Sequence, residues 1–285
     1  MLLMENINGV PTIYASLRGQ RLRLRGITKL LRACFYPTYK WGGRQGEQVD
    51  HECAQDMGYD WLPVDKRRAA AAKRRVVKGA SLGTDVDYQL RLFANAPAKF
   101  VKMGSGVRAT TKDVITAYAS WGWRVQVSQF PVGAPDLRLG TPIDMIALDG
   151  DDKPVLIENK TGYDDTLHKS SGHMRGPLSD VDDRPLHQFF LQLFTELLLV
   201  KYYWGLDFGT SAYVVQANTR GVTPYQIPEW LLRRERQVWA YFSEFASMSG
   251  PGPAKRSAPD RYRNVAWTGG QPDPKRSKPA DGAPT

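Results

Sequence analysis

Cysteine is nearly absent from this sequence of 285 residues, in which Cys34 and Cys53 are the only two. Two thiolates are too few for a four-cysteine zinc or iron–sulfur site, and a disulfide framework is not expected in a reducing compartment. The sequence also lacks a Gly-Lys-Ser or Gly-Lys-Thr phosphate-binding loop, which argues against an ATP-driven motor. The sequence therefore argues against a four-cysteine metal site and against an ATP-driven motor.

Long apolar runs are missing as well. No stretch approaches the roughly 20 apolar residues of a membrane-spanning helix. The N-terminus, MLLMENINGV, lacks the basic and apolar blocks of a signal peptide. We therefore expect a soluble, intracellular protein without a membrane partner. Short basic clusters near the C-terminus, such as Lys275–Lys278, suit nuclear import in a eukaryotic host, non-specific DNA contacts or a solvated tail.

Positive charge, in contrast, is abundant. The formal net charge is +10 and the sequence pI is about 9.6, which predicts a polyanionic partner, with nucleic acid first and an anionic membrane surface second. The alanine-rich segment Asp65–Lys78 favours a helix, on which Arg67, Arg74 and Lys78 share one stripe. A stripe of one sign without Glu indicates contact with DNA phosphates, whereas the alternative is a solvated helix face.

The patterns along the chain predict three regions: an N-terminal basic segment with helices (1–62), a core domain (63–248) and a disordered basic tail (249–285). In the first region we expect a basic strand from Pro11 and a helix over Thr28–Cys34. The core reads as helix, strand, hairpin, helix, strand and helix, which fits an α/β fold. These elements are Thr110–Trp121, Trp123–Val132, Gly140–Lys160, Leu186–Trp204, Ser211–Ala217 and Ile227–Phe245.

The hairpin Gly140–Lys160 contains the residues on which the functional argument rests. Strands are expected over Ile143–Leu148 and Val155–Lys160, joined by the turn Asp149–Asp152, because Asp and Gly tolerate left-handed backbone. If the turn is centred near Asp151, facing residues have numbers that sum to about 302. Asp144 then lies opposite Glu158. The period of two also places Glu158 and Lys160 on the same face.

Two facing carboxylates repel each other unless a cation lies between them. Mg²⁺ suits Asp144 and Glu158 because it prefers carboxylate oxygens and keeps several waters. Lys160 could then hold or help to deprotonate an attacking water, or stabilise charge on a phosphate. The alternative is a surface hairpin with ordinary charged residues. The preceding apolar run Val155–Ile157 argues against it, because such a run belongs to a buried strand.

The two stretches Gly140-Thr-Pro-Ile-Asp144 and Ile157-Glu158-Asn159-Lys160-Thr161 resemble the Asp and Glu-x-Lys core of the PD-(D/E)xK nuclease superfamily, in particular its RecB-like and phage lambda-type exonuclease branch. The resemblance implies a restriction-endonuclease-like fold, with a mixed central sheet flanked by helices. It also implies Mg²⁺-dependent hydrolysis of phosphodiester bonds, with Mn²⁺ as a substitute ion, at the ends of duplex DNA.

The resemblance implies two further site residues. In the family, a helix with Gly-x-x-x-His, or with an acid in place of the His, adds a metal ligand, for which Asp87 in Gly83–Asp87 is preferred over Asp50 in Gly46–Asp50. A Gln on the helix after the Glu-x-Lys strand faces the site in the family, and Gln192 matches best, with Gln188 second. A Gln that only bonds backbone is the structural alternative.

Other functions stay open beside the exonuclease. They are a non-catalytic nucleic-acid-binding protein on the same fold and a structure-specific endonuclease. The oligomeric state, homo-oligomers included, and the choice between DNA and RNA are likewise open. The polar loop Thr161–Arg184 is expected to border the path of the nucleic acid, without a chemical role for its two histidines, His168 and His173.

Overall fold

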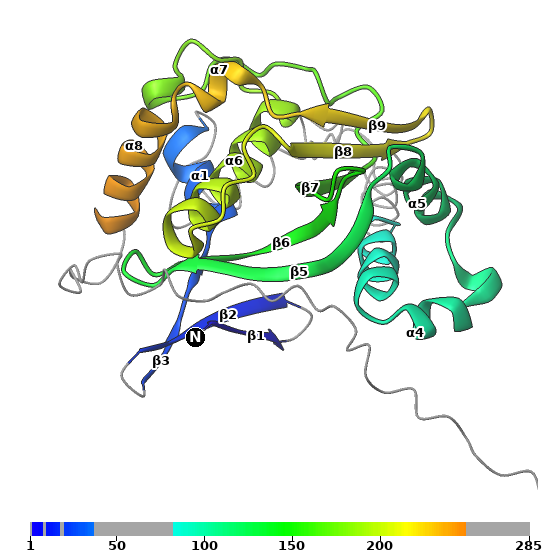
Figure 1. Cartoon of the computed structure of the whole chain (residues 1–285). Helices are drawn as coiled ribbons and strands as arrows, with labels where there is room; N and C mark the ends of the chain where they lie inside the picture. Colours follow the sequence, from blue (N-terminus) through cyan, green and yellow to red (C-terminus); the bar gives the residue numbers. More distant parts are fainter. Residues whose placement is uncertain (1, 8–9, 18–19, 37–81, 249–285) are drawn as a thin grey trace, which may run out of the picture.

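The structure of the protein is a computed structural model that describes residues 2–7, 10–17, 20–36 and 82–248 (Figure 1). Several predictions from the sequence lie outside these residues. They concern the basic stripe of Arg67, Arg74 and Lys78, the competing acid Asp50, and the C-terminal tail 249–285.

A six-stranded mixed sheet forms the centre of the molecule (Figure 1). Its order is β4-β6-β7-β8-β9, and β5 pairs with β6 off this path. The β6–β7 and β8–β9 pairs are antiparallel, whereas β7 and β8 are parallel. Parallel neighbours need a crossover, which α6 provides. The strands are β4 (Arg25–Gly26), β5 (Arg124–Ala134), β6 (Leu139–Leu148), β7 (Pro154–Thr161), β8 (Ala212–Asn218) and β9 (Gly221–Gln226), and the crossover helix is α6 (Pro185–Trp204).

Helices cover both faces of this sheet. One core packs α6, α1 (Ile27–Phe35) and α8 (Glu235–Met248) against strand residues such as Leu156 and Val214. The other core packs α5 (Ala109–Ser120) and the helix at 82–95 against Val155, Ile157 and neighbouring residues. Alternate residues of β7 therefore enter opposite cores, as the pleat of a strand requires. The predicted α/β architecture with a mixed central sheet flanked by helices is confirmed.

The predicted hairpin is also confirmed, including its register. Met145 pairs with Ile157, and Ile146 pairs with Leu156, which is the register expected from the sequence. The side chain of Asp149 stabilises the turn, because its Oδ1 accepts the backbone N–H groups of Asp151 and Lys153, each at 2.9 Å.

The N-terminal region contains more strand than the sequence predicted. Instead of one basic strand there are three, β1 (Leu2–Ile7), β2 (Val10–Leu17) and β3 (Gln20–Arg23), which form a separate antiparallel sheet. Arg21 stabilises this sheet: it pairs with Glu5, and its guanidinium carbon lies 3.7 Å from the ring centroid of Tyr14. The strand β4 then joins the central sheet beside β6.

The single helix predicted over Ile227–Phe245 is wrong. Pro228 caps a short α7 (Glu229–Leu232), and α8 starts only at Glu235. The break between these helices frees Arg234 to bind both carboxylate oxygens of Asp180, at 2.5 and 2.6 Å. Four further elements were not predicted: β9, α4 (Pro97–Lys102) and the two short 3₁₀ turns at Gly104–Gly106 and Gly176–Leu178. Within the described residues, no helix has the combined length and hydrophobicity of a membrane span.

Candidate active site

Asp144 on β6 is half-buried and held from both neighbouring strands. Its Oδ2 accepts the backbone N–H of Asn159 on β7 at 3.0 Å. Its Oδ1 accepts the Nε2 amide of Gln129 on β5 at 3.3 Å. These donors fix the carboxylate where the central strands run side by side.

Glu158 and Lys160 are direct neighbours, as the period of two predicted. Glu158 is only 1% exposed, and its Oε1 accepts a hydrogen bond from Nζ of Lys160. The same Nζ lies 4.7 Å from the ring centroid of Phe189 on α6, a distance suited to a cation–π contact. The lysine is therefore held between a carboxylate and an aromatic ring, with a fifth of its side chain exposed.

Gln192 reaches this cluster from α6. Its Nε2 donates to Glu158 Oε1 at 2.6 Å and also lies 3.3 Å from Oε1 of Glu196. Gln188, the second candidate in the sequence, instead donates to Asp183 Oδ1 at 2.8 Å. The structure thus separates the two glutamines and places Gln192 beside the candidate site.

Asp87 lies on the helix at 82–95 and interacts electrostatically with Asp144 and Lys160. The residue is solvent-exposed overall, yet partial loss of solvent at its carboxyl and the charge of Asp144 raise its pKa to about 7. Buried Gln89 anchors this helix. Its Oε1 accepts hydrogen bonds from the hydroxyl of Thr111 at 2.7 Å and from the backbone N–H of Arg108 at 2.9 Å.

A fourth carboxylate, Glu196, was not assigned to the site from the sequence. It is fully buried on α6, and its Oε2 has no hydrogen-bond partner among the described residues. Burial and the charges of Glu158 and Asp144 raise its pKa well above the usual value. The available signal was its place in a polar stripe of an otherwise apolar helix, which also contains Gln192 and Thr195.

The charges of the cluster are unbalanced. Burial and the charge of Asp144 raise the pKa of Glu158 to about 8, against the opposing effect of Lys160. Burial alone would lower the pKa of Lys160, but the charges of Glu158 and Asp144 outweigh it and raise that pKa. One buried oxygen of Glu158, Oε2, accepts no hydrogen bond from a donor among the described residues. Several carboxylates thus converge on a single ammonium group, an arrangement that a further cation would stabilise.

The donor set fits Mg²⁺. Among the described residues, no three or more His, Cys, Asp or Glu side chains are already gathered around one point as a metal site. Mg²⁺ does not require such a cage, because it commonly binds one or two carboxylates and completes its shell with water and phosphate oxygens. Asp144 and Glu158 provide hard oxygen donors, and the unpartnered Oε2 of Glu158 is one of them.

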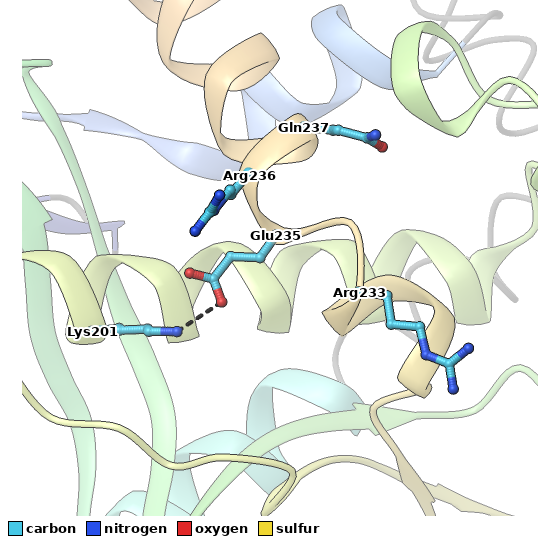
Figure 2. Close-up of a pocket in the computed structure, with 5 residues that line it drawn as sticks. All are labelled: Lys201, Arg233, Glu235, Arg236 and Gln237. Carbon is cyan, nitrogen blue, oxygen red and sulfur yellow. Dashed lines mark hydrogen bonds and ion pairs between the residues drawn. The ribbon is translucent and has the colours of Figure 1, made fainter.

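A pocket of about 540 Å³ lies elsewhere, between α6 and the start of α8 (Figure 2). It shares no residue with the cluster around Glu158. Its charges are largely paired: Lys201 bonds Glu235 at 2.8 Å, and Arg233 bonds Glu229 at 2.6 Å. Arg236 is the remaining cation of the lining, and it has no ion pair among the described residues. The lining of the pocket consists of Lys201, Arg233, Glu235, Arg236 and Gln237.

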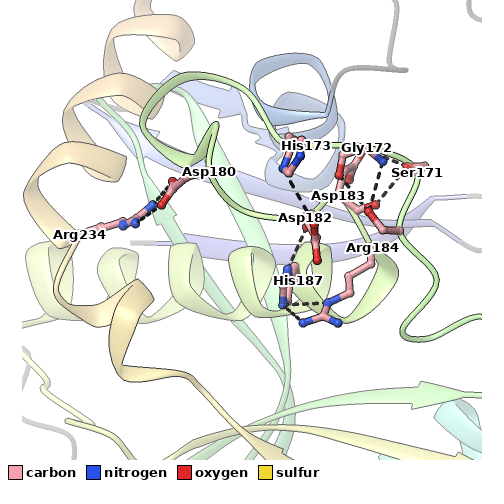
Figure 3. A network of polar contacts seen from close by, with 10 residues as sticks. Ser171, Gly172, His173, Asp180, Asp182, Asp183, Arg184, His187 and Arg234 are labelled. Atoms are coloured by element: carbon pink, nitrogen blue, oxygen red, sulfur yellow. Dashed lines mark hydrogen bonds and ion pairs between the residues drawn. The ribbon is translucent and has the colours of Figure 1, made fainter.

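The loop between β7 and α6 is tied down by polar contacts (Figure 3). Nε2 of His187 accepts a hydrogen bond from Nε of Arg184 at 2.9 Å, and Nδ1 of His187 donates one to the carbonyl of Asp182 at 2.8 Å. Burial lowers the pKa of His187, in keeping with a neutral ring in this role. His173 forms a β-bridge with Asp182. These contacts hold the loop onto α6, and the predicted role of the loop beside nucleic acid stays a prediction.

Comparison with known proteins adds no identity. The chain matches no protein-family model, and no curated protein matches it. The site is therefore interpreted from its own residues and geometry.

Proposed function

We propose that this protein is a Mg²⁺-dependent DNA nuclease with a restriction-endonuclease-like fold, related in its site to the PD-(D/E)xK superfamily. The observation that supports this most is the meeting of Asp144, Glu158, Lys160 and Gln192. They come from β6, β7 and α6 and form one partly buried polar cluster. Strongly perturbed pKa values cluster at functional sites, so a buried group of charges with raised pKa values supports a functional role.

Each residue has a role in this proposal. Asp144 and Glu158 would hold Mg²⁺ or Mn²⁺, which supplies Lewis-acid chemistry toward a phosphate when bound. Lys160 would hold the attacking water and stabilise charge on the phosphate, because its ammonium is the only cation in direct contact with Glu158 among the described residues. Gln192 would orient Glu158, and Asp87 would complete the acidic shell from its own helix.

The proposed substrate is duplex DNA, cut from its ends. Its support is the resemblance to lambda-type exonucleases together with the positive net charge. Most of that excess charge belongs to residues outside the described ranges, including Arg67, Arg74 and Lys78, which we propose as phosphate contacts. A structure-specific endonuclease would use the same chemical groups, so the form of the substrate must separate the two.

A second candidate is a non-catalytic nucleic-acid-binding protein on the same fold. One observation favours it: Lys160 and Gln192 both bond the same oxygen of Glu158, so the cluster already partly satisfies itself. A catalytic site would need Mg²⁺ and substrate to reopen these bonds. The two candidates differ in whether DNA is cut at all.

The test is cleavage of end-labelled linear DNA and of closed circular DNA, each with Mg²⁺ and with EDTA. We expect Mg²⁺-dependent release of nucleotides from linear DNA, and none from circles. Asp144→Asn should abolish cleavage and retain DNA binding, whereas Asp149→Asn in the adjacent turn serves as the matched control and should cut normally. Cutting of circles would favour an endonuclease. DNA binding without cleavage in Mg²⁺ or Mn²⁺ would favour the non-catalytic protein, and full activity of Asp144→Asn would reject the site.

A further inference from the structure

Gln129 on β5 lies directly across from Asp144 and has unusual backbone geometry. Its neighbours pair regularly with β6, Ser128 with Met145 and Phe130 with Ile143, so the same register brings Gln129 opposite Asp144. At Gln129 itself φ is +57°, in the left-handed region. This region is unfavourable for a residue with a long side chain, and Gln is not among the types that tolerate it best.

A clamp on the preceding residue maintains this conformation. Asn95 makes two hydrogen bonds with the backbone of Ser128: its Nδ2 donates to the carbonyl at 2.8 Å, and its Oδ1 accepts the N–H at 2.9 Å. The hydroxyl of Ser128 then donates to the carbonyl of Asp144 at 2.8 Å. Asn95 ends the helix at 82–95 that also contains Asp87. The clamp therefore connects that helix, β5 and Asp144.

The side chain of Gln129 uses this geometry to contact the candidate acid. Its Nε2 donates to Oδ1 of Asp144, and the backbone N–H of Asn159 donates to the other oxygen. One donor from each side sets the plane of the carboxylate. Because an amide has no charge, it orients the carboxylate without neutralising it, and the acid stays able to bind a cation.

We propose that Gln129 is a positioning residue that orients Asp144 for the reaction. The role rests on the proposed function of Asp144 and goes beyond it, since neither the sequence motif nor the resemblance includes Gln129. Strained backbone persists where the surrounding structure enforces it, and it clusters at functional sites. Here the strain turns an amide toward a carboxylate.

The decisive variant is Gln129→Gly, because glycine adopts the left-handed conformation freely but lacks the amide. We expect kcat on linear DNA to fall roughly 10- to 100-fold with KM little changed. Binding of Mn²⁺ alone, followed by calorimetry, should weaken, while Tm stays the same or rises. Gln126→Gly, on an exposed position of the same strand, is the matched control and should keep the wild-type kcat and Mn²⁺ affinity, with a slightly lower Tm because glycine weakens a strand. Wild-type kcat and Mn²⁺ affinity in Gln129→Gly would overturn the proposal.

A failure of the nuclease proposal can be distinguished from a failure of the positioning role proposed for Gln129. If the wild-type protein cuts no nucleic acid and binds no Mn²⁺, the nuclease proposal is rejected. The contact itself is then tested by Tm in the set Gln129→Gly, Asp144→Asn and the double variant. A non-additive Tm shift supports the orientation of Asp144 by Gln129, and an additive shift overturns it.

Discussion

The two faces of β7 follow the same alternation but end in different states. Toward α5, the series Val155, Ile157 and Asn159 finishes in a satisfied pair, because buried Tyr118 donates its hydroxyl to Oδ1 of Asn159. Toward α6, the series Leu156, Glu158 and Lys160 finishes in a crowded acidic cluster. There, within the part of the chain that the structure describes, no hydrogen-bond donor reaches the Oε2 atoms of Glu158 and Glu196.

The comparison shows where this fold accepts an energetic penalty. A buried polar atom without a partner is costly, and a buried charge more so. The α5 face avoids the penalty with one hydrogen bond between side chains 41 positions apart. The α6 face retains this penalty, although the strands on both faces belong to the same regularly paired sheet. Such an imbalance at one face is expected of a site selected for binding a cation and substrate, since selection for stability alone would remove it.

The largest expected effect comes from removing the cation of the α6 face. Lys160→Ala should reduce cleavage by about 10³-fold or more, because in the proposed mechanism this ammonium group holds the water and stabilises the phosphate. Lys153→Ala, in the exposed turn of the same hairpin, should have no effect. Rates measured on end-labelled DNA at saturating Mg²⁺ decide this. Equal rates for the two variants would place the chemistry elsewhere.

The second largest expected effect is an increase in stability that accompanies a loss of cleavage. Glu158→Gln removes the buried charge but keeps an oxygen for Lys160 and Gln192, and its new amide can donate toward Asp144. In EDTA at pH 8 it should raise the free energy of unfolding by about 1–3 kcal/mol, while cleavage is lost. Urea unfolding measures the first and the DNA assay the second. A less stable Glu158→Gln protein would mean that the α6 face is a satisfied ion pair.

The hairpin was predictable from the sequence because its signals are local. Alternation sets the faces of β6 and β7, and the Asp-rich turn sets their register, so the positions of Asp144, Glu158 and Lys160 follow from counting. The strand β9 gave no such signal, since GVTPYQ contains Pro224 and is mostly exposed. Its place in the sheet depends on pairing with β8, which is a tertiary contact.

The arrangement of the candidate active site, like the fold, was predictable from the sequence only in part. Gln192 stands out as a polar residue on an apolar helix, and the structure brings it to Glu158. The position of Gln129 could not be foreseen, because its left-handed backbone depends on Asn95, 33 residues from Ser128. Glu196 shows the same limit: its polarity was visible in the sequence, but its burial beside Glu158 arises only from packing.

A pH series should sharpen the contrast between the two faces. An unfolded Glu loses its proton near pH 4.3, whereas the folded pKa of Glu158 is raised to about 8. The stability from this group is therefore complete below about pH 4.3 and is lost as pH rises toward 8. In EDTA, Tm should fall by a few degrees from pH 5 to pH 8, and Mg²⁺ should flatten the fall. In Glu158→Gln the fall of Tm between pH 5 and pH 8 should be smaller than in the wild-type protein. A Tm that rises with pH in EDTA would contradict the raised pKa.

The smallest expected effect tests the α5 face. Tyr118→Phe leaves Oδ1 of Asn159 without its donor and creates on this face the kind of orphan that the α6 face already contains. The shape of the buried ring is kept, so only the hydrogen bond is lost. Unfolding in urea should show a loss of about 1–2 kcal/mol. Cleavage should stay within about twofold of wild type, because the backbone N–H of Asn159 still bonds Asp144. If Tyr118→Phe instead reduced cleavage as far as Lys160→Ala, the two faces would act as one unit, and the unpartnered carboxylates would no longer distinguish the site.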